Sequence, residues 1–182
     1  MVNPNPQSHY VGPGIAQDVV SRTLSVIVDN EPGVLARVIG LFTARGYNID
    51  SLTVTETEHD RQVSRITIVT RGTPAVIEQI KHQLERLVPV HRVRDLTGEG
   101  ISLERELALV KVAGKGEKRI EAMRMAEIFR AQVVDTSTEH FIFEITGKAS
   151  KIETFIGLMR ELGLVEVSRT GVAAIGRGAG AM

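Results

Sequence analysis

Residues 29–49, DNEPGVLARVIGLFTARGYNI, decide the fold because they join a strand, a helix and a second strand in one short run. The preceding residues 23–28, TLSVIV, are rich in β-branched side chains and predict a buried strand. Pro32 suits the first helical turn, where its missing N–H has no helical partner, and Asp29 or Asn30 can cap the free amides. The helix carries an apolar stripe that is expected to face a sheet: Val34, Leu35, Val38, Ile39, Leu41 and Phe42.

Two glycines mark this predicted helix. Gly46 is expected to end it. Gly40 lies in its middle, where glycine costs roughly 1 kcal/mol relative to alanine. A close approach of the helix to other backbone is a physical reason for a glycine there.

The start of the helix is suited to a small anion. Its first turn leaves backbone N–H groups without helical partners and carries a partial positive charge. Gly33 allows close approach, and the Asn30 side chain offers both a donor and an acceptor, as the carboxylate and ammonium of an α-amino acid require. A capped helix without a ligand explains the same residues. The pattern alone favours that simpler interpretation, because proline-glycine helix starts are common.

Composition excludes several classes of protein. A length of 182 residues with 42% hydrophobic content fits one domain or, better, two small ones. The 22 basic and 22 acidic residues give a formal net charge of zero, which argues against nucleic-acid and anionic-membrane partners. The absence of cysteine rules out disulfides and thiol catalysis. No apolar run has the length of a membrane span or the pattern of a signal peptide, so we predict a cytoplasmic protein.

The order of predicted elements occurs twice. Residues 1–21 hold three of the six prolines and are predicted to be a flexible tail. Residues 22–97 then give a βαββαβ order, with Thr73 and Pro74 as the cap and first position of its second helix. The remaining boundaries are a linker at 98–103, a second βαββαβ domain at 104–175 and a flexible tail at 176–182.

This order predicts an α+β protein with two tandem ferredoxin-like βαββαβ domains. In the second domain, the helix that begins near Glu117 is expected to bury four residues: Ile120, Met123, Ile128 and Phe129. Sheets of this type have one uncovered face and open edges. We therefore expect a homo-oligomer, most economically a two-fold dimer built through the first domain.

Sequence motifs for catalysis are missing. No nucleophile elbow, Walker loop or dinucleotide fingerprint is present. The histidines lack metal-ligand spacing, so we predict no metal site and no catalytic residue on this chain; they are His9, His59, His82, His91 and His140.

Several segments together resemble one family. Residues 24–54, with NEPGVLARVIGLF and RGYNIDSLTV, are similar to the ACT domain of the small regulatory subunits of acetohydroxyacid synthase, also called acetolactate synthase. The segments ERELALVKV, AEIFRAQVVD and VEVSRTGVAAIGRG resemble the second domain and C-terminal end of that family. The resemblance covers about residues 22–178 and implies an N-terminal ACT domain followed by a C-terminal ferredoxin-like domain.

The resemblance also implies a function. Such subunits have no active site; they bind and activate a catalytic large subunit and confer feedback inhibition by valine in branched-chain amino acid biosynthesis. The large subunit makes acetolactate or acetohydroxybutyrate with thiamine diphosphate, Mg²⁺ and usually FAD, so this chain is expected to hold no cofactor. The valine motif falls on Asn30, Gly33 and Asn48, at an interface between two ACT domains of a homodimer. Residues that could line the isopropyl pocket are Val34, Leu35 and Ile49.

Two alternatives remain from the sequence. An acylphosphatase-like enzyme would need a cationic loop after the first strand, but residues 29–32 are acidic here. A stand-alone ACT-type amino-acid sensor, including one that governs transcription, would share the first domain; a basic reading helix for DNA is missing. Selectivity among valine, leucine and isoleucine, the surface that meets the large subunit, the stoichiometry and the role of the N-terminal tail stay open.

Overall fold

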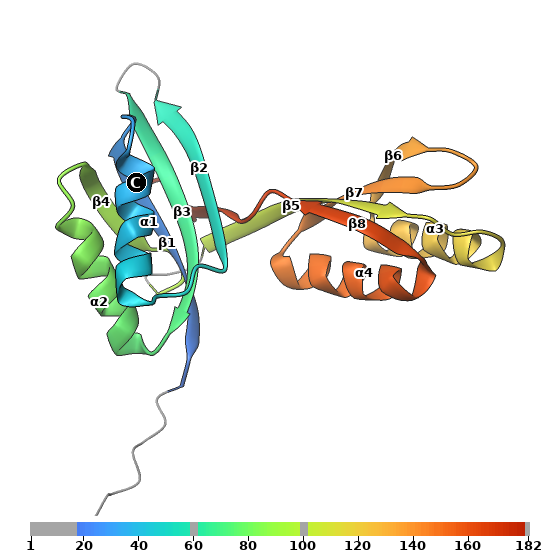
Figure 1. The fold of residues 1–182 in the computed structure, drawn as a ribbon, viewed down its shortest axis with the longest axis horizontal. Helices are drawn as coiled ribbons and strands as arrows, with labels where there is room; N and C mark the ends of the chain where they lie inside the picture. The colour runs from blue at the N-terminus through green and yellow to red at the C-terminus, as the bar shows by residue number, and fades with distance from the viewer. Residues whose placement is uncertain (1–17, 59–61, 99–101, 181–182) are drawn as a thin grey trace, which may run out of the picture.

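The computed structural model describes residues 18–58, 62–98 and 102–180. These residues form two α+β units with the order βαββαβ, which confirms the predicted fold class (Figure 1). The first unit comprises β1 (Val20–Asp29), α1 (Val34–Arg45), β2 (Ser51–Glu58), β3 (Val63–Gly72), α2 (Pro74–Glu85) and β4 (Val90–Asp95). The second comprises β5 (Ser102–Val112), α3 (Glu117–Phe129), β6 (Gln132–Thr136), β7 (Phe141–Gly147), α4 (Ala149–Leu162) and β8 (Leu164–Arg169), followed by a short strand β9 (Ala173–Gly176).

The first unit is a four-stranded antiparallel sheet in the order β2-β3-β1-β4. Both of its helices cover one face (Figure 1). On that face, Val26 of β1 lies opposite Ile66 of β3 and Val93 of β4. Thr73 caps α2 as predicted, because its Oγ1 accepts a hydrogen bond of 3.4 Å from the Val76 amide. The sheet leaves β2 and β4 as its edges.

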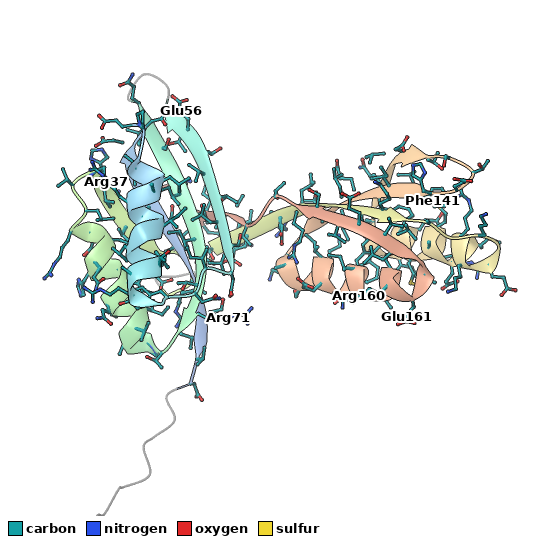
Figure 2. The ribbon with its side chains drawn as sticks, in the orientation of Figure 1. Arg37, Glu56, Arg71, Phe141, Arg160 and Glu161 are labelled. Atoms are coloured by element: carbon teal, nitrogen blue, oxygen red, sulfur yellow. The ribbon has the colours of Figure 1, made fainter. Side chains whose placement is uncertain are left out.

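The second unit repeats this arrangement with the order β6-β7-β5-β8. Helices α3 and α4 cover one face of its sheet, and Arg160 and Glu161 near the end of α4 point away from that sheet (Figure 2). Val110 of β5 lies opposite Phe143 of β7 in the buried layer. The edge strand β6 is exposed along its whole length.

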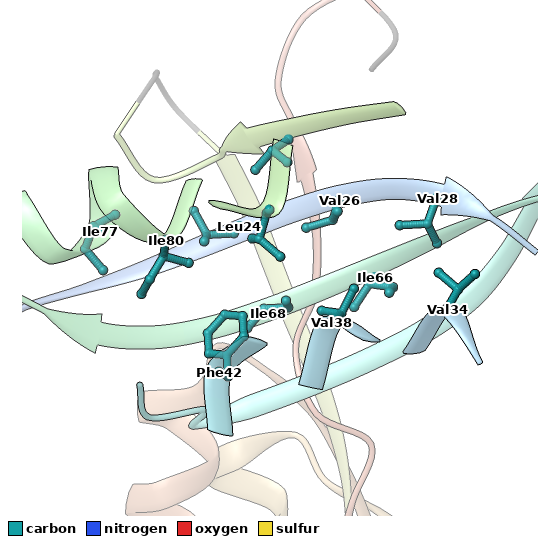
Figure 3. Packing of buried hydrophobic residues seen from close by; sticks show 12 residues of the cluster. Leu24, Val26, Val28, Val34, Val38, Phe42, Ile66, Ile68, Ile77 and Ile80 are labelled. Atoms are coloured by element: carbon teal, nitrogen blue, oxygen red, sulfur yellow. The ribbon is translucent and has the colours of Figure 1, made fainter. Parts of the chain in front are cut away.

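Each unit has its own hydrophobic core. In the first, Val34, Val38 and Phe42 of α1 pack onto β1 and β3 (Figure 3). The predicted α1 stripe was too wide, because Leu35 and Ile39 stay 36% and 38% exposed. A helix on an open sheet buries only the side that touches the strands, so these two side chains remain available to a partner.

In α3 the buried positions differ from those predicted. Ala122 and Ala126 face the core, whereas Ile120 and Ile128 are exposed. Small side chains let α3 approach α4 and the sheet closely. The predicted stripe was therefore wrong at Ile120 and Ile128, because the prediction assigned the larger side chains to the core.

The start of strand β5 contacts the first unit, where Thr23 Oγ1 of β1 donates to Glu104 Oε1 at 2.6 Å. The first residues of β5 pair with β9, from Ser102 opposite Gly176 to Arg105 opposite Ala173, and its remaining residues pair with β7 and β8. β5 thus begins inside the predicted linker 98–103, and Gly176 of the predicted tail 176–182 ends a strand. At the other end, β1 begins at Val20, inside the predicted tail of residues 1–21; residues 1–17 lie outside the described ranges, as do residues 59–61 of the predicted hairpin turn.

None of the helices in the described residues is both long enough and apolar enough to span a membrane.

Candidate functional site

The loop of residues 29–33 leads from β1 into α1 through a left-handed glycine. Gly33 occupies the helix N-cap position with φ +86°, and no side chain caps the helix. The predicted cap by Asp29 or Asn30 was therefore wrong. Asp29 instead reaches across to β4, where its carboxylate lies 2.6 Å from His91 Nε2. Gly33 adopts a left-handed conformation that directs the chain into the helix, so the helix begins without a side-chain cap.

Backbone hydrogen bonds hold this loop in place. The Asn30 amide donates to the Gln62 carbonyl at 2.7 Å, which ties the loop to the start of β3. The Gly33 carbonyl accepts from the Arg37 amide at 3.1 Å, as the first helical hydrogen bond. The Asn30 side chain is on an exposed residue. A fixed backbone therefore presents an exposed polar side chain beside the helix start.

The first turn of α1 is suited to a carboxylate. The Val34 amide makes only a long contact of 3.4 Å to the Glu31 carbonyl, and the next two amides precede the first helical acceptor. No acidic residue lies in the first turn. The partial positive charge of the helix start is thus not offset by a side chain of its own turn.

Asn48 lies beyond the other end of α1, after the Gly46 cap. Its Nδ2 donates to Asp50 Oδ1 at 2.5 Å, and Asp50 Oδ2 lies 2.6 Å from Arg71 Nε. Its backbone carbonyl accepts from Thr70 Oγ1 at 2.6 Å. A carboxylate only accepts hydrogen bonds. The side-chain NH₂ of Asn48 therefore faces Asp50, and the Asn48 Oδ1 remains open to other partners. That oxygen is an acceptor for an ammonium group.

Asp50 and Arg71 were missed in the sequence. Their pairing depends on the register of the β2–β3 hairpin, in which the Asp50 amide donates to the Val69 carbonyl at 2.8 Å. A strand alignment drawn before choosing candidates would have placed an acid beside a base at this position.

The apolar candidates divide into buried and accessible groups. Val34 is 5% exposed and belongs to the core, so the prediction that its side chain lines the pocket was wrong. Leu35 is on the exposed side of α1. Ile49 packs partly against the core beside Asn48. Leu35 and Ile49 therefore remain as side chains that can contact a ligand.

One protomer does not bring these residues together. Helix α1 has 12 residues, which at 1.5 Å per residue separate its start from its end by about 18 Å. Figure 2 labels Arg37 near the start of α1 and Arg71 toward the opposite end of the unit. Asn30, Gly33 and Leu35 lie at the first end, with Asn48 and Ile49 at the second. A site that uses both ends needs two copies of the chain.

Apolar residues are exposed on the surface between the two ends. Ile39 and Gly40 are exposed on α1, and a Cβ added at Gly40 would meet nothing within 4 Å. Among the described residues, no backbone outside α1 approaches this glycine, so the close approach expected there is not made within the chain. On the neighbouring edge strand β2, Val54 is 44% exposed. Helix and strand together form an uncovered strip beside the candidate site.

A partly buried ion pair lies where the second unit meets the first. Arg169 donates two hydrogen bonds of 2.7 Å to Glu106, whose side chain is 4% exposed, and a third to Glu153. The hydrogen bonds to Glu106 are the main cause that raises the pKa of Arg169 above its ordinary value. This pair lines a cavity of about 660 Å³ between the units, whose wall also includes Asp50 and Arg71. The partners of Asn48 thus adjoin the contact between the units.

Comparison with known proteins gives matches over both units. Residues 24–92 match the ACT domain of acetohydroxyacid synthase small-subunit-like proteins, and residues 105–178 match the small subunit of acetolactate synthase. A probable acetolactate synthase small subunit from Archaeoglobus fulgidus is 48% identical over 159 residues, which cover 87% of this chain and 98% of that protein. The acetolactate synthase isozyme 3 small subunit of Escherichia coli is 46% identical and covers 86% of this chain and 96% of its own length.

A solved structure agrees with these sequence matches. The acetolactate synthase small subunit from Thermotoga maritima superposes with a TM-score of 0.79 at 40% identity, over 88% of this chain and 99% of that one. The sequence resemblance is thereby confirmed: the chain belongs to the family of acetolactate synthase small subunits.

Proposed function

We propose that this chain is the regulatory subunit of an acetolactate synthase: it binds a catalytic large subunit, raises its activity and makes it sensitive to valine. The supporting observation is the placement of the candidate residues at opposite ends of α1, with an uncovered apolar strip between them. Membership of the small-subunit family supports the expectation that the chain binds a catalytic large subunit. In this proposal, the large subunit holds thiamine diphosphate, Mg²⁺ and FAD. This chain contributes regulation and no catalytic group.

The proposed effector site forms between two protomers. Two α1 helices pack antiparallel across a two-fold axis, so that the helix start of one protomer meets Asn48 of the other. Leu35, Ile39 and Gly40 supply the helix contact, and the β2 edges pair beside it. This pairing covers the exposed Val54 and the unpaired backbone of an edge strand.

Valine has three groups, and each meets a complementary feature of the site. Its carboxylate accepts from the free amides after Gly33 in the first turn of α1. Its ammonium donates to the side-chain oxygens of Asn30 and the partner's Asn48. Its isopropyl group packs between Leu35 and Ile49, where burial contributes roughly 1.5–3 kcal/mol.

Regulation follows from linkage between valine and the catalytic subunit. Valine orders Asn48, and through it Asp50 and Arg71 in the wall of the cavity between the units. A shift there changes how the second unit is held against the first. If that arrangement weakens the stimulating contact, each ligand lowers the affinity for the other, typically by about 1–3 kcal/mol.

The first experiment combines this chain with its cognate catalytic subunit and measures acetolactate formation with and without valine. We expect stimulation by the chain and inhibition by valine. An unchanged rate on adding the chain contradicts the regulatory role, and stimulation without any valine response contradicts the effector assignment. An acylphosphate hydrolysis assay on the chain alone tests the enzyme alternative.

Two substitutions at one position locate the site. Gly33→Asp puts a carboxylate where the carboxylate of valine binds, and we expect half-inhibition to need at least about tenfold more valine. Gly33→Asn is the matched control, because asparagine has nearly the same shape, tolerates a left-handed backbone and carries no charge. Equal valine responses in both variants contradict the placement of the carboxylate at Gly33.

A further inference from the structure

The C-terminal segment, residues 170–180, returns from the second unit and covers the helix-free face of the first sheet. Val172 and Ala174 pack there against Leu96 in a small apolar cluster. Two hydrogen bonds attach the segment to β2: Thr53 Oγ1 donates to the Val172 carbonyl at 3.0 Å, and the Val172 amide donates to Ser51 Oγ at 2.9 Å. A face that would otherwise be open to solvent is therefore partly closed.

Beyond this cluster, the segment and the sheet enclose a pocket of about 410 Å³. Its floor is the helix-free face of the first sheet, and its other wall is the end of the C-terminal segment. The lining residues are Ile27, Thr57, Val63, Arg65, Arg94, Leu96, Ala174, Ile175, Gly176, Gly178 and Gly180. Two arginines line this pocket, and none of the described residues that line it is acidic.

Arg65 is the residue that points to a ligand. It lies on β3 between Ile27 of β1 and Thr55 of β2, on the face opposite the buried Ile66. Its Nε is buried and has no hydrogen-bond partner among the described residues. A guanidinium presents its donors as a planar fork, and a buried donor without an acceptor is costly. An acceptor supplied from outside the chain would satisfy it.

Arg94 adds a second positive charge on the adjacent side of the pocket. It has an interaction of its own, so its contribution is the charge it brings to the wall. Opposite the arginines, Gly176, Gly178 and Gly180 carry no side chains, and a Cβ added at any of them would meet nothing within 4 Å. These three glycines therefore leave room for a ligand beside the arginines.

We propose that this pocket binds a small oxyanion, the phosphate or carboxylate group of a metabolite, through the guanidinium of Arg65. Paired oxygens at such a group match the arginine fork and accept two parallel hydrogen bonds. The volume suits a small molecule. The pocket lies on the opposite face of the sheet from α1, so its ligand and valine bind at separate sites. Binding would also attach the C-terminal segment to the first unit.

The test measures binding of inorganic phosphate and of acetate to the full chain by titration calorimetry. We expect saturable binding of at least one anion, and the tighter of the two identifies the recognised group. Arg65→Gln should weaken that affinity at least tenfold. Arg92→Gln is the matched control, because Arg92 lies opposite Ile27 on the neighbouring strand without lining the pocket; its affinity should stay within twofold of the wild type.

A second variant separates charge from geometry. Arg65→Lys keeps the positive charge and loses the fork, so its affinity should fall between those of the wild type and Arg65→Gln. Circular dichroism and a valine titration on the same samples show whether each variant is folded. Two results overturn the proposal: a wild type that binds neither anion at millimolar concentrations, or a folded Arg65→Gln variant with undiminished affinity.

Discussion

The two units of this chain share an element order and differ at the start of their first helix. Helix α1 follows Gly33 and has no acidic residue in its first turn. Helix α3 follows Gly116 and carries Glu117 there. A carboxylate in the first turn offsets the partial positive charge that would otherwise attract an anion. The start of α1 thus keeps a partial positive charge that no carboxylate of its own turn offsets, whereas α3 supplies such a carboxylate.

The two units also differ in the residues that follow these helices. Asn48 follows the Gly46 cap of α1 by two residues, and Gln132 follows the Arg130 cap of α3 by two. The Asn48 amide is oriented by Asp50, whereas Gln132 lies on an exposed edge strand. The two units thus share a backbone order and differ in chemistry at the ends of their first helices.

Substitutions in the two hydrophobic cores should destabilise the two units separately, and these are the largest effects that we expect. Phe42 is 1% exposed in the first core, and Phe155 is fully buried against Phe129 and Phe143 in the second. Either change to alanine should lower the free energy of unfolding by about 3–5 kcal/mol. Denaturation in urea measures the loss. Valine titration then distinguishes them: Phe42→Ala loses affinity because it loosens α1, and Phe155→Ala keeps it. Loss of valine affinity in both variants would show that the units do not act separately.

A smaller stability effect is expected at the contact between the units. Glu106→Gln removes the charge that Arg169 pairs with and should cost about 2 kcal/mol, since one partner is buried and the other is partly exposed. Glu153→Gln is the control, because that side chain is 59% exposed and meets the same guanidinium. Thermal unfolding of both variants provides the measurement. Equal destabilisation by the two substitutions would contradict the importance assigned to the buried carboxylate.

Valine affinity should fall when Asn48, which follows α1, is replaced, and should stay unchanged when Gln132, which follows α3, is replaced. Asn48→Ala removes an acceptor for the valine ammonium, and we expect about a tenfold loss of affinity, the usual size for a hydrogen bond to a charged group. Gln132→Ala at the corresponding position of the second unit should leave the affinity unchanged. Calorimetry with valine compares the two, and an equal loss in both would remove the distinction between the units.

The smallest effect is expected at an exposed ion pair. Lys111 Nζ lies 2.7 Å from Glu166, and its hydrogen bond and charge lower the pKa of that carboxyl. A lowered pKa in the folded state contributes stability above the pKa of the unfolded chain, and this contribution disappears as the pH falls through the folded value. Lys111→Met should therefore be slightly less stable than the wild type near pH 7, and the difference should be smaller at about pH 3. Urea denaturation at both pH values tests the sign; a difference that grows in acid would contradict it.

Much of the fold was predictable because its signals are local. The stripe of Ile152, Phe155, Ile156, Met159 and Leu162 predicts α4; the first four residues are buried, and Leu162 is partly buried. Thr73 and Pro74 predicted the start of α2. β9 was not predicted, because its four residues carry no alternation of their own and it forms by pairing with the distant start of β5. Contacts far apart in the sequence leave no periodic pattern.

The candidate site was predictable only in part. The loop before α1 and the Gly46 cap could be read from residue types. The role of Asp50 and Arg71 depends on hairpin register, and the absence of a side-chain cap depends on the backbone angle at Gly33. The burial of Val34 follows from the rotation of α1 against the sheet. Each of these features is set by tertiary geometry.

A mixed-dimer experiment tests most directly whether valine bridges two protomers. Gly33→Asp disables the helix start and Asn48→Ala disables the opposite end, so each variant alone forms dimers in which both sites are impaired. After the two variants exchange subunits at random, half of the dimers contain one of each and have one site with both native residues. We expect tight valine binding to return at roughly a quarter of all sites. A mixture that binds valine no better than its components would place Gly33 and Asn48 in separate roles and contradict the account.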